Sequence, residues 1–351
     1  MSKTGEVVAI LGGGSFGTAM ATILAANGHA VRIWVRDPET VAAINAIGEN
    51  PRYLPGKSLP EGIEATDSLA RALDGATLIF IALPSQAFAE VLPQAASLVA
   101  AETLVVSCTK GIHQDGFLLM SQLLEKHWPQ AVVAVLSGPN LAREVVEQRF
   151  SGTVIASANA AACGRVQQVM SCHYFRVYDN PDRFGVELAG ALKNIYAIAT
   201  GMAMSMGVGQ NSSAFLITRS LAEMSRFAVR LGANPLTFLG LAGVGDLIVT
   251  CTSPLSRNYR VGQALGQGKS LAQAVAELGQ TAEGVNTVHL VAEQAEQLGV
   301  YMPIAAALNE VLFHDLPIAE AISGLMGGEH NHDVEFAVDP ALLQSTTVDS
   351  E

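Results

Sequence analysis

Lys193 and Asn194 interrupt a stretch of sequence, residues 188–203, that is otherwise apolar. Such a stretch predicts a buried helix. Because an unpaired lysine is costly to bury, the Lys193 ammonium should face a partner or a cleft. Removal from water also lowers the pKa of a lysine, which suits a group that donates and accepts a proton. The alternative is a lysine whose side chain reaches solvent at the edge of the helix.

Two further polar segments directly follow apolar runs of strand length. Residues 107–111 read SCTKG and contain Lys110, and residues 137–140 read SGPN and contain Gly138 and Asn140. If both runs are strands of one parallel sheet, these segments lie at its carboxyl edge, where ligands bind. Lys110 can contact a phosphate or a polarised carbonyl there, and Gly138 and Asn140 can contact substrate or cofactor. A plain surface lysine is the alternative for Lys110.

A third polar cluster follows residue 240. The glycine-rich segment GLAGVG precedes Asp246, and Ser256, Arg257 and Asn258 follow shortly afterwards. An aspartate at this place can orient a lysine ammonium or accept a hydrogen bond from a substrate hydroxyl. The three adjacent residues supply donors, and a guanidinium matches phosphate oxygens through paired hydrogen bonds. A solvated polar loop is the alternative.

Gly12, Gly14 and Gly17 form the pattern G-x-G-x-x-G near the start of the chain. The pattern alone is weak, but here it follows an apolar strand, opens a helix and lies in a unit that reaches the next strand at residue 30. Gly12 permits the tight turn, Gly14 lets the backbone approach a pyrophosphate, and Gly17 lets the helix pack on the strand. We therefore predict a dinucleotide site, with a ligand-free glycine turn as the alternative.

Arg36 and Asp37 follow the second predicted strand, at the place that reports on cofactor choice. A carboxylate there binds a ribose 2′-hydroxyl, whereas an arginine suits a 2′-phosphate. Asp37 also precedes Pro38, so it can instead cap the helix predicted over residues 38–47. Arg36 therefore favours NADP, with NAD tolerated, unless Arg36 is only a solvated charge.

The chain is expected to belong to the α/β class. Apolar runs of strand length occupy residues 7–11, 30–35, 77–82, 103–107, 132–136 and 154–158, and helical segments alternate with them. This alternation predicts a doubly wound parallel sheet of the Rossmann type. From about residue 186 only helical spacing remains, which predicts an all-α second domain. We place a dinucleotide-binding domain at residues 1–185, a helical substrate-binding domain at 186–335 and an acidic tail at 336–351.

Composition excludes several classes of protein. The net charge of −12 disfavours binding to nucleic acid or to anionic lipid, and 15% charged residues with 50% hydrophobic residues argue against disorder. The four cysteines form no C-x-x-C pair, and no signal peptide is evident, so we expect reduced thiols in a cytoplasmic protein. We expect no stable membrane insertion and no metal site, because His330 and His332 lie in a polar tail without suitable partners.

With these motifs in view, the chain resembles the bacterial NAD(P)-dependent glycerol-3-phosphate dehydrogenases over residues 6–328. The resemblance rests on residues 12–18, 107–111, 137–139 and 188–195, and above all on residues 240–258, GLAGVGDLIVTCTSPLSRN. It implies a Rossmann domain, a helical substrate domain, and the interconversion of sn-glycerol 3-phosphate and dihydroxyacetone phosphate with NAD or NADP. It also implies a role in supplying glycerol 3-phosphate for glycerophospholipid synthesis.

The resemblance also implies roles for individual residues. Lys193 would be the acid–base residue, assisted by Lys110 and Asp246. The implied substrate site comprises Lys110, Gly138, Asn140, Lys193, Asp246, Ser256, Arg257 and Asn258. The implied cofactor site comprises Gly12, Gly14, Ser15, Phe16, Gly17, Arg36, Lys110, Ala142, Arg257, Thr281 and Glu283. Asn140 departs from the serine usual in the family, and Phe215 replaces an alanine in its G-x-N-x-x-A-A pattern.

Two other functions remain open at this point. One is a related two-domain dehydrogenase for hydroxyacyl or hydroxy-acid substrates, against which Ser256, Arg257 and Asn258 favour a phosphate. The other is a nucleotide-binding module without catalysis, against which the lysine in an apolar helix argues. A homodimer is plausible, because so apolar a helical domain can bury a shared face.

Overall fold

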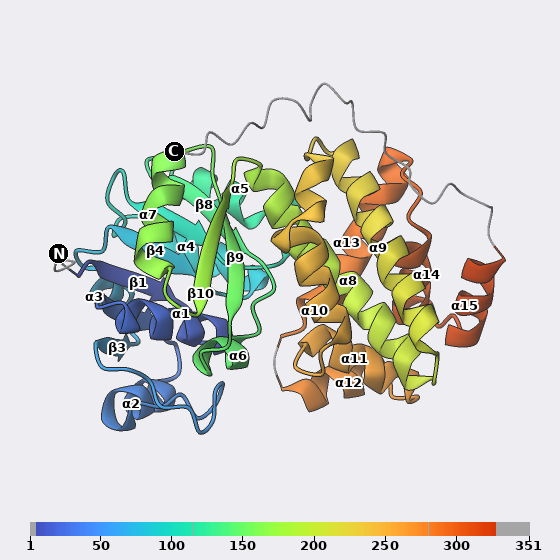
Figure 1. Cartoon of the computed structure of the whole chain (residues 1–351), viewed down its shortest axis with the longest axis horizontal. Helices are drawn as coiled ribbons and strands as arrows, with labels where there is room; N and C mark the ends of the chain where they lie inside the picture. The colour runs from blue at the N-terminus through green and yellow to red at the C-terminus, as the bar shows by residue number, and fades with distance from the viewer. Residues whose placement is uncertain (1–4, 115, 280, 328–351) are drawn as a thin grey trace.

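The computed structural model describes residues 5–114, 116–279 and 281–327, so the predicted acidic tail lies outside the described residues. A sheet covered by helices forms the first half of the chain, and a bundle of helices forms the second half (Figure 1). The two halves are joined by α8, Arg183–Ser205, which begins where the last strand of the sheet ends. This confirms the predicted α/β arrangement with a helical second part.

The sheet has the strand order β10-β9-β8-β5-β4-β1-β2-β3. Its strands are β1 Val7–Leu11, β2 Ala30–Trp34, β3 Ile63–Thr66, β4 Leu78–Ile81, β5 Leu104–Ser107, β8 Val132–Ser137, β9 Ser151–Ala156 and β10 Phe175–Asn180. The neighbouring strands from β3 to β8 are all parallel, whereas β9 runs antiparallel to β8 and parallel to β10. A small hairpin, β6 Ile112–His113 and β7 Leu118–Leu119, follows β5.

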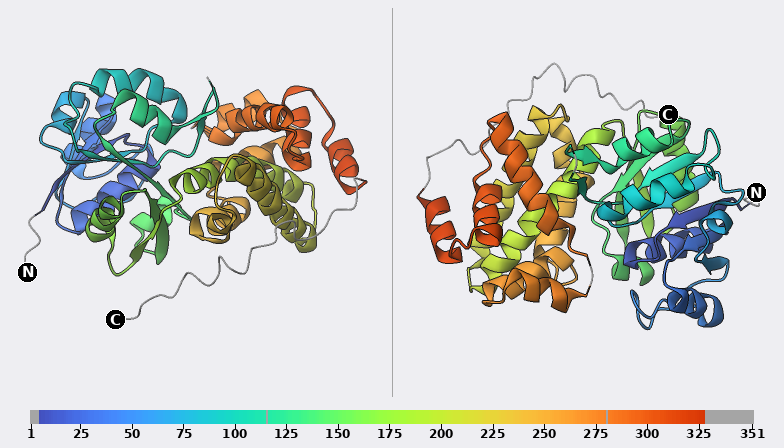
Figure 2. Two further views of the ribbon diagram at one scale, coloured as in Figure 1. Left: turned by 90° about the horizontal axis from the view of Figure 1, so that it is seen from above. Right: turned by 180° about the vertical axis from the view of Figure 1, so that it is seen from behind.

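Helices cover both faces of this sheet (Figure 2). They are α1 Ser15–Ala26, α2 Pro38–Ile47, α3 Leu69–Leu73, α4 Phe88–Ala95, α5 Met120–His127, α6 Ala142–Val146 and α7 Ala160–Met170, with a short 3-10 turn η1 at Ser85–Ala87. Alternate residues of each strand point to opposite faces, so Ile10 packs with α1 and α7 while Leu11 packs with α4 and α5. Continuous apolar strands are thus buried on both sides, which confirms the doubly wound fold.

The turn between β1 and α1 forms around the predicted glycines. Gly12 has φ +116°, which only glycine adopts without strain, and a Cβ there would lie 2.6 Å from the Ala82 carbonyl oxygen. A Cβ on Gly17 would lie 1.9 Å from the carbonyl oxygen of Gly12, so α1 can approach β1 only with glycine at that position. Asp37 caps α2 by accepting the Glu39 N–H, as predicted.

The second half is helical throughout its described residues. After α8 come α9 Gln210–Arg230, the 3-10 turn η2 Pro235–Leu239, a π-helical turn η3 Leu241–Gly245, α10 Asp246–Thr252, α11 Arg257–Gly266, α12 Leu271–Leu278, α13 Glu283–Leu298, α14 Pro303–Phe313 and α15 Ile318–Met326. None of these helices is both long enough and apolar enough to cross a membrane. α8 lies at the centre of the bundle, where Leu188–Ile198 are buried.

Glycines let α8 and α11 pack backbone against backbone. A Cβ on Gly201 of α8 would lie 2.1 Å from the Tyr259 carbonyl oxygen, and a Cβ on Gly262 of α11 would lie 2.0 Å from the Ile198 carbonyl oxygen. Larger residues would push the two helices apart. This contact matters for the site, since α8 carries Lys193 and α11 begins with Arg257.

Glu187 ties α8 to the sheet domain. Its Oε1 accepts the N–H of Ser121 in α5 at 2.9 Å, and the side chain is buried. Burial raises the pKa of this carboxyl to about 7, against the opposing effect of the Ser121 hydrogen bonds. The helix that carries Lys193 is therefore held to both domains.

The sequence-based boundaries agree with the structure for several elements, but the strands at both edges of the sheet were not predicted. The predicted ranges 7–11 and 38–47 match β1 and α2. β3 and β10 were not predicted. Both strands lie at the edges of the sheet and alternate apolar with polar residues, so neither forms a continuous apolar run. The antiparallel pairing of β8 with β9 also departs from the predicted all-parallel sheet.

We predict that Gly262→Ala destabilises the protein and that Gly164→Ala does not. Gly262 lies against the backbone of α8, whereas a Cβ on Gly164 in α7 meets nothing within 4 Å. The first change should lower the free energy of unfolding by about 1–3 kcal/mol or more through overpacking. The second should raise it by about 0.5–1 kcal/mol through helix propensity. Urea unfolding measures both, and equal stability of the two variants would contradict this view of α8 and α11.

Candidate active site

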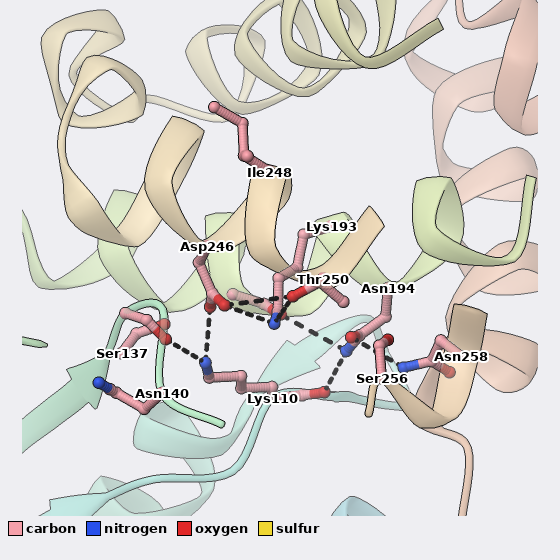
Figure 3. Close-up of polar contacts among 12 residues, drawn as sticks. Lys110, Ser137, Asn140, Lys193, Asn194, Asp246, Ile248, Thr250, Ser256 and Asn258 are labelled. Atoms are coloured by element: carbon pink, nitrogen blue, oxygen red, sulfur yellow. Dashed lines mark hydrogen bonds and ion pairs between the residues drawn. The ribbon is translucent and has the colours of Figure 1, made fainter. Parts of the chain in front are cut away.

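The Asp246 carboxylate joins two lysines that lie far apart in the sequence. Its Oδ1 accepts from Lys193 Nζ at 2.6 Å, and its Oδ2 accepts from Lys110 Nζ at 2.6 Å. Lys193 also donates to the Thr250 hydroxyl, which in turn donates to Asp246 Oδ1 at 3.3 Å. Figure 3 shows these side chains converging from α8, α10 and the loop after β5. The prediction that Lys193 faces a partner is confirmed.

Burial changes the acidity of Lys193. Its side chain is 8% exposed, and that of Lys110 is 19% exposed. Removal from water lowers the pKa of Lys193 to about 8; Asp246 opposes this shift and Lys110 adds to it. A lysine with this pKa exchanges a proton near neutral pH. Of its three N–H groups, two are donated to Asp246 and Thr250, and within the described part of the chain the third is left for a ligand.

The glycine-rich segment before Asp246 forms the π-helical turn η3. A Cβ on Gly243 would lie 2.3 Å from the Phe238 carbonyl oxygen, so glycine is required where this turn packs on η2. The turn runs directly into α10, which begins at Asp246 and carries Thr250 one turn later on the same face. Single π turns of this kind often mark functional sites.

A chain of amide hydrogen bonds connects the site to three helices. Asn194 Nδ2 donates to the Lys110 carbonyl oxygen at 3.2 Å, and Asn258 Nδ2 donates to Asn194 Oδ1 at 2.9 Å. Asn258 Oδ1 then accepts the N–H of Gly284 in α13 at 3.0 Å. The loop that holds Lys110 is thereby fixed to α8, α11 and α13 (Figure 3). Asn194 Nδ2 also donates to the Gly190 carbonyl oxygen at 3.5 Å, so of the two side-chain amides only that of Asn258 keeps an N–H beyond the bonds of the described residues.

Ser256 and Arg257 lie at the start of α11, beside this chain. The Ser256 hydroxyl oxygen accepts the Tyr259 N–H at 3.3 Å and caps the helix, which leaves its O–H free to donate to an anion. The Arg257 side chain is exposed and interacts electrostatically with Glu283. Together with Lys110 and Lys193, Arg257 gives this part of the chain three cationic side chains, beside the carboxylates of Asp246 and Glu283.

The segment after β8 supplies further polar groups. Lys110 Nζ donates to the Gly138 carbonyl oxygen at 2.9 Å. Asn140 donates through Nδ2 to the Gly152 carbonyl oxygen at 2.9 Å. Among the described residues, the buried Oδ1 of Asn140 and the buried hydroxyl of Ser137 have no hydrogen-bond partner. Buried polar atoms without partners are uncommon and fit a site that is completed by a ligand.

The glycine turn fits a dinucleotide. The N-terminus of α1 has no side-chain cap and no acidic residue in its first turn, so its N–H groups are available to an anion. A Cβ on Gly14 would meet nothing within 4 Å, which leaves the turn open on that side. Ser15 donates from Oγ to the Tyr53 carbonyl oxygen at 3.1 Å, and Phe16 and Ala142 each pack against the sheet core. The pyrophosphate of a nicotinamide dinucleotide suits this edge.

Two predicted cofactor residues lie on opposite sides of that turn. Arg36 is exposed and lies 3.9 Å from the Glu90 carboxylate, so the structure does not bring it to the lysines. Glu283, preceded by Thr281, accepts from the backbone N–H of Ser85 at 2.9 Å and from its hydroxyl at 2.5 Å. This contact joins α13 of the helical domain to η1 of the sheet domain, at the same carboxyl edge.

Sequence reasoning left three of these residues without a role. Thr250 lies one helical turn after Asp246, a spacing that could have suggested a shared face. Asn194 was seen only as an interruption of the apolar helix. Ser85 gave no signal, because its partner Glu283 lies on a distant element.

Comparisons with known proteins identify the family of the chain. The family model described as NAD-dependent glycerol-3-phosphate dehydrogenase N-terminus matches residues 7–163, and the corresponding C-terminus model matches residues 182–323. A curated protein of Alcanivorax borkumensis named glycerol-3-phosphate dehydrogenase [NAD(P)+] is 65% identical over 336 residues, or 96% of this chain and 98% of the relative.

Solved structures show the same architecture. The crystal structure of glycerol-3-phosphate dehydrogenase from Coxiella burnetii superposes with a TM-score of 0.89 at 38% identity, covering 92% of this chain and 99% of that one. The enzyme from Saccharomyces cerevisiae superposes with a TM-score of 0.78 at 26% identity, covering 92% and 99%. On its sequence, its fold and its site, the chain belongs to the family of NAD(P)-dependent glycerol-3-phosphate dehydrogenases.

Proposed function

We propose that the chain interconverts sn-glycerol 3-phosphate and dihydroxyacetone phosphate by hydride transfer to or from NAD(P), with Lys193 as the acid–base residue. The observation that carries this proposal is the buried Lys193 ammonium, held by Asp246 and Thr250 beside Lys110 at the carboxyl edge of the sheet. The membership of the chain in a family of NAD(P) oxidoreductases supports this proposal. The side chains of Ser256, Arg257 and Asn258, which can bind a phosphate, support it as well.

The cofactor site is assigned to the groups around the glycine turn. Gly12, Gly14 and Gly17, with Ser15 and Phe16, would hold the pyrophosphate; Arg36 and Ala142 would lie along the dinucleotide. Lys110, Arg257, Thr281 and Glu283 would lie near the nicotinamide. The bound nicotinamide supplies or accepts the hydride.

The substrate site is assigned to the polar groups around the two lysines. Arg257, Ser256 and Asn258 hold the phosphate of dihydroxyacetone phosphate through charge-assisted hydrogen bonds. Gly138 and Asn140 line the same edge. Lys110 and Lys193 polarise the ketone oxygen, and Lys193 donates a proton to that oxygen as the carbonyl carbon is reduced. Asp246 keeps the two ammonium groups in place and compensates their charge.

Several properties follow from the proposal. Arg36, rather than a free Asp37 carboxylate, supports a preference for NADP over NAD. The product, glycerol 3-phosphate, is the backbone of glycerophospholipids, which supports a role in their synthesis in the cytoplasm. The apolar character of the helical domain, which can bury a shared face, supports a homodimer.

The test of this function follows the oxidation of NADPH and of NADH with dihydroxyacetone phosphate, side by side with 2-keto acids and 3-ketoacyl substrates. We expect turnover with dihydroxyacetone phosphate and both cofactors, faster or tighter with NADPH, and little turnover with carbonyl substrates that lack a phosphate. Preference for a keto acid would overturn the substrate assignment. Absence of turnover with every carbonyl would favour a non-catalytic nucleotide-binding protein.

Lys193→Ala should abolish most turnover but leave cofactor binding intact. Removal of a general acid costs about 10²–10⁴-fold in rate. Steady-state kinetics and NADPH binding by calorimetry measure the two effects separately. Lys269→Ala, which removes an exposed lysine paired with Glu277, serves as the control and should match the wild type. Wild-type turnover in Lys193→Ala would show that Lys193 is not the proton donor.

The pH dependence of the two directions should be opposite. Reduction of dihydroxyacetone phosphate needs protonated Lys193, so kcat/KM should fall as pH rises through about 8; oxidation of glycerol 3-phosphate needs the neutral amine, so kcat/KM should rise through the same pH. Asp246→Asn removes the carboxylate that raises this pKa, so the residual activity should show the limb at lower pH. Asp74→Asn, at an exposed aspartate, is the control. If kcat/KM changes at the same pH in Asp246→Asn as in the wild type, Lys193 is not the group whose titration controls the rate.

A further inference from the structure

Two exposed arginines lie near the carboxyl end of β2, each beside a different carboxylate: Arg36 beside Glu90, and Arg52 beside Asp37. Arg36 lies two residues after the strand, and Arg52 lies in the loop after α2, with its Nη1 3.3 Å from Oδ2 of Asp37, the residue next to Arg36. The Arg36 side chain is 62% exposed and that of Arg52 is 60% exposed, whereas Asp37 is 32% exposed. Two guanidinium groups therefore face solvent where the adenosine ribose of a dinucleotide lies in this fold.

The Asp37 carboxylate already has partners within the protein. Asp37 Oδ1 accepts the Glu39 N–H, and Asp37 Oδ2 accepts from the Thr40 hydroxyl at 2.5 Å as well as from Arg52. A carboxylate that reads an unphosphorylated ribose must accept hydrogen bonds from its hydroxyls. Asp37 instead caps α2 and neutralises one arginine.

The loop that carries Arg52 is fixed to the glycine turn. Asn50 is fully buried and donates from Nδ2 to the Gly13 carbonyl oxygen at 2.9 Å and to the Thr18 hydroxyl at 2.8 Å. The carbonyl of Tyr53 accepts from Ser15 at 3.1 Å. Because these anchors flank Arg52 on both sides in the sequence, its backbone has a defined position relative to the pyrophosphate-binding turn.

We infer that Arg52, together with Arg36, binds the 2′-phosphate of NADP and sets the preference for NADP over NAD. This inference rests on the proposed dinucleotide-dependent function and assigns Arg52, which no motif marked. Each guanidinium has five N–H donors in a planar fork, so Arg52 can keep its contact with Asp37 and still donate to a phosphate. Glu90, 3.9 Å from Arg36, is too exposed and too distant to compete strongly with a phosphate dianion.

The experiment measures binding by calorimetry, without turnover. The probes are 2′,5′-ADP and 5′-AMP, which differ by the 2′-phosphate alone, and NADP⁺ and NAD⁺. The variants are Arg52→Gln, Asn50→Ala and, as a matched control, Arg71→Gln, which removes an exposed arginine paired with Glu64 on the same domain. Circular dichroism verifies that each variant is folded.

Arg52→Gln should weaken 2′,5′-ADP and NADP⁺ by about tenfold to a hundredfold, the usual loss for a hydrogen bond to a charged group. It should leave 5′-AMP and NAD⁺ unchanged or slightly tighter, because Asp37 loses a partner. Asn50→Ala should weaken all four probes through the glycine turn, and Arg71→Gln should change none.

Equal weakening of all four probes in Arg52→Gln would show that Arg52 only supports the loop and would overturn the inference. Unchanged binding of 2′,5′-ADP would overturn it as well. Failure of the proposed function has a different signature: wild-type protein would separate 2′,5′-ADP from 5′-AMP and yet reduce no dihydroxyacetone phosphate.

Discussion

The candidate site depends on one carboxylate that is shared by two ammonium groups. Asp246 is 1% exposed and accepts from Lys193 and Lys110 on its two oxygens. Without it, two positive charges would lie close together in a poorly solvated place, and removal of one partner from a buried ion pair costs about 3–5 kcal/mol. The same carboxylate opposes the fall in the pKa of Lys193 that burial and Lys110 cause. Asp246 therefore both holds the two lysines in place and affects the acidity of Lys193.

Three elements that are distant in the sequence bring Asp246 and the two lysines together. Lys110 follows a strand of the sheet, Lys193 lies in the central helix of the bundle, and Asp246 begins a short helix after a π turn. Glycines at 201 and 262 let α8 pack closely on α11, and Gly243 lets the π turn before Asp246 pack closely on η2. The amides of Asn194 and Asn258 then connect them. Such supporting bonds hold reactive groups in place before a ligand arrives.

The two domains also meet on both sides of the lysines. Glu187 accepts from Ser121 on one side, and Glu283 accepts from Ser85 on the other. Both contacts pair a carboxylate from the helical domain with a backbone N–H of the sheet domain. Relative rotation of the domains would break these bonds and separate Lys110 from Asp246, so the geometry of the interface is part of the site.

The sequence alone determined the local elements and the chemistry of single residues. The glycine pattern after β1, the cap at Asp37, the doubly wound sheet and the lysine inside an apolar helix were all predictable, because each depends on neighbours a few residues away. The same holds for the positive charge at residues 256–258. The edge strands β3 and β10 were not predicted, since half-exposed strands lack a continuous apolar run.

Only the tertiary structure decided which of these groups meet. Asp246 and Lys110 are 136 residues apart in sequence, and Ser85 and Glu283 are 198 apart. Arg52 carries no motif, yet its contact with Asp37 places it at the end of β2. Such pairs form because helices pack through specific glycines and loops are bound by buried amides such as Asn50. Long-range complementarity of this kind is a property of packed surfaces, which no local pattern in a single sequence records.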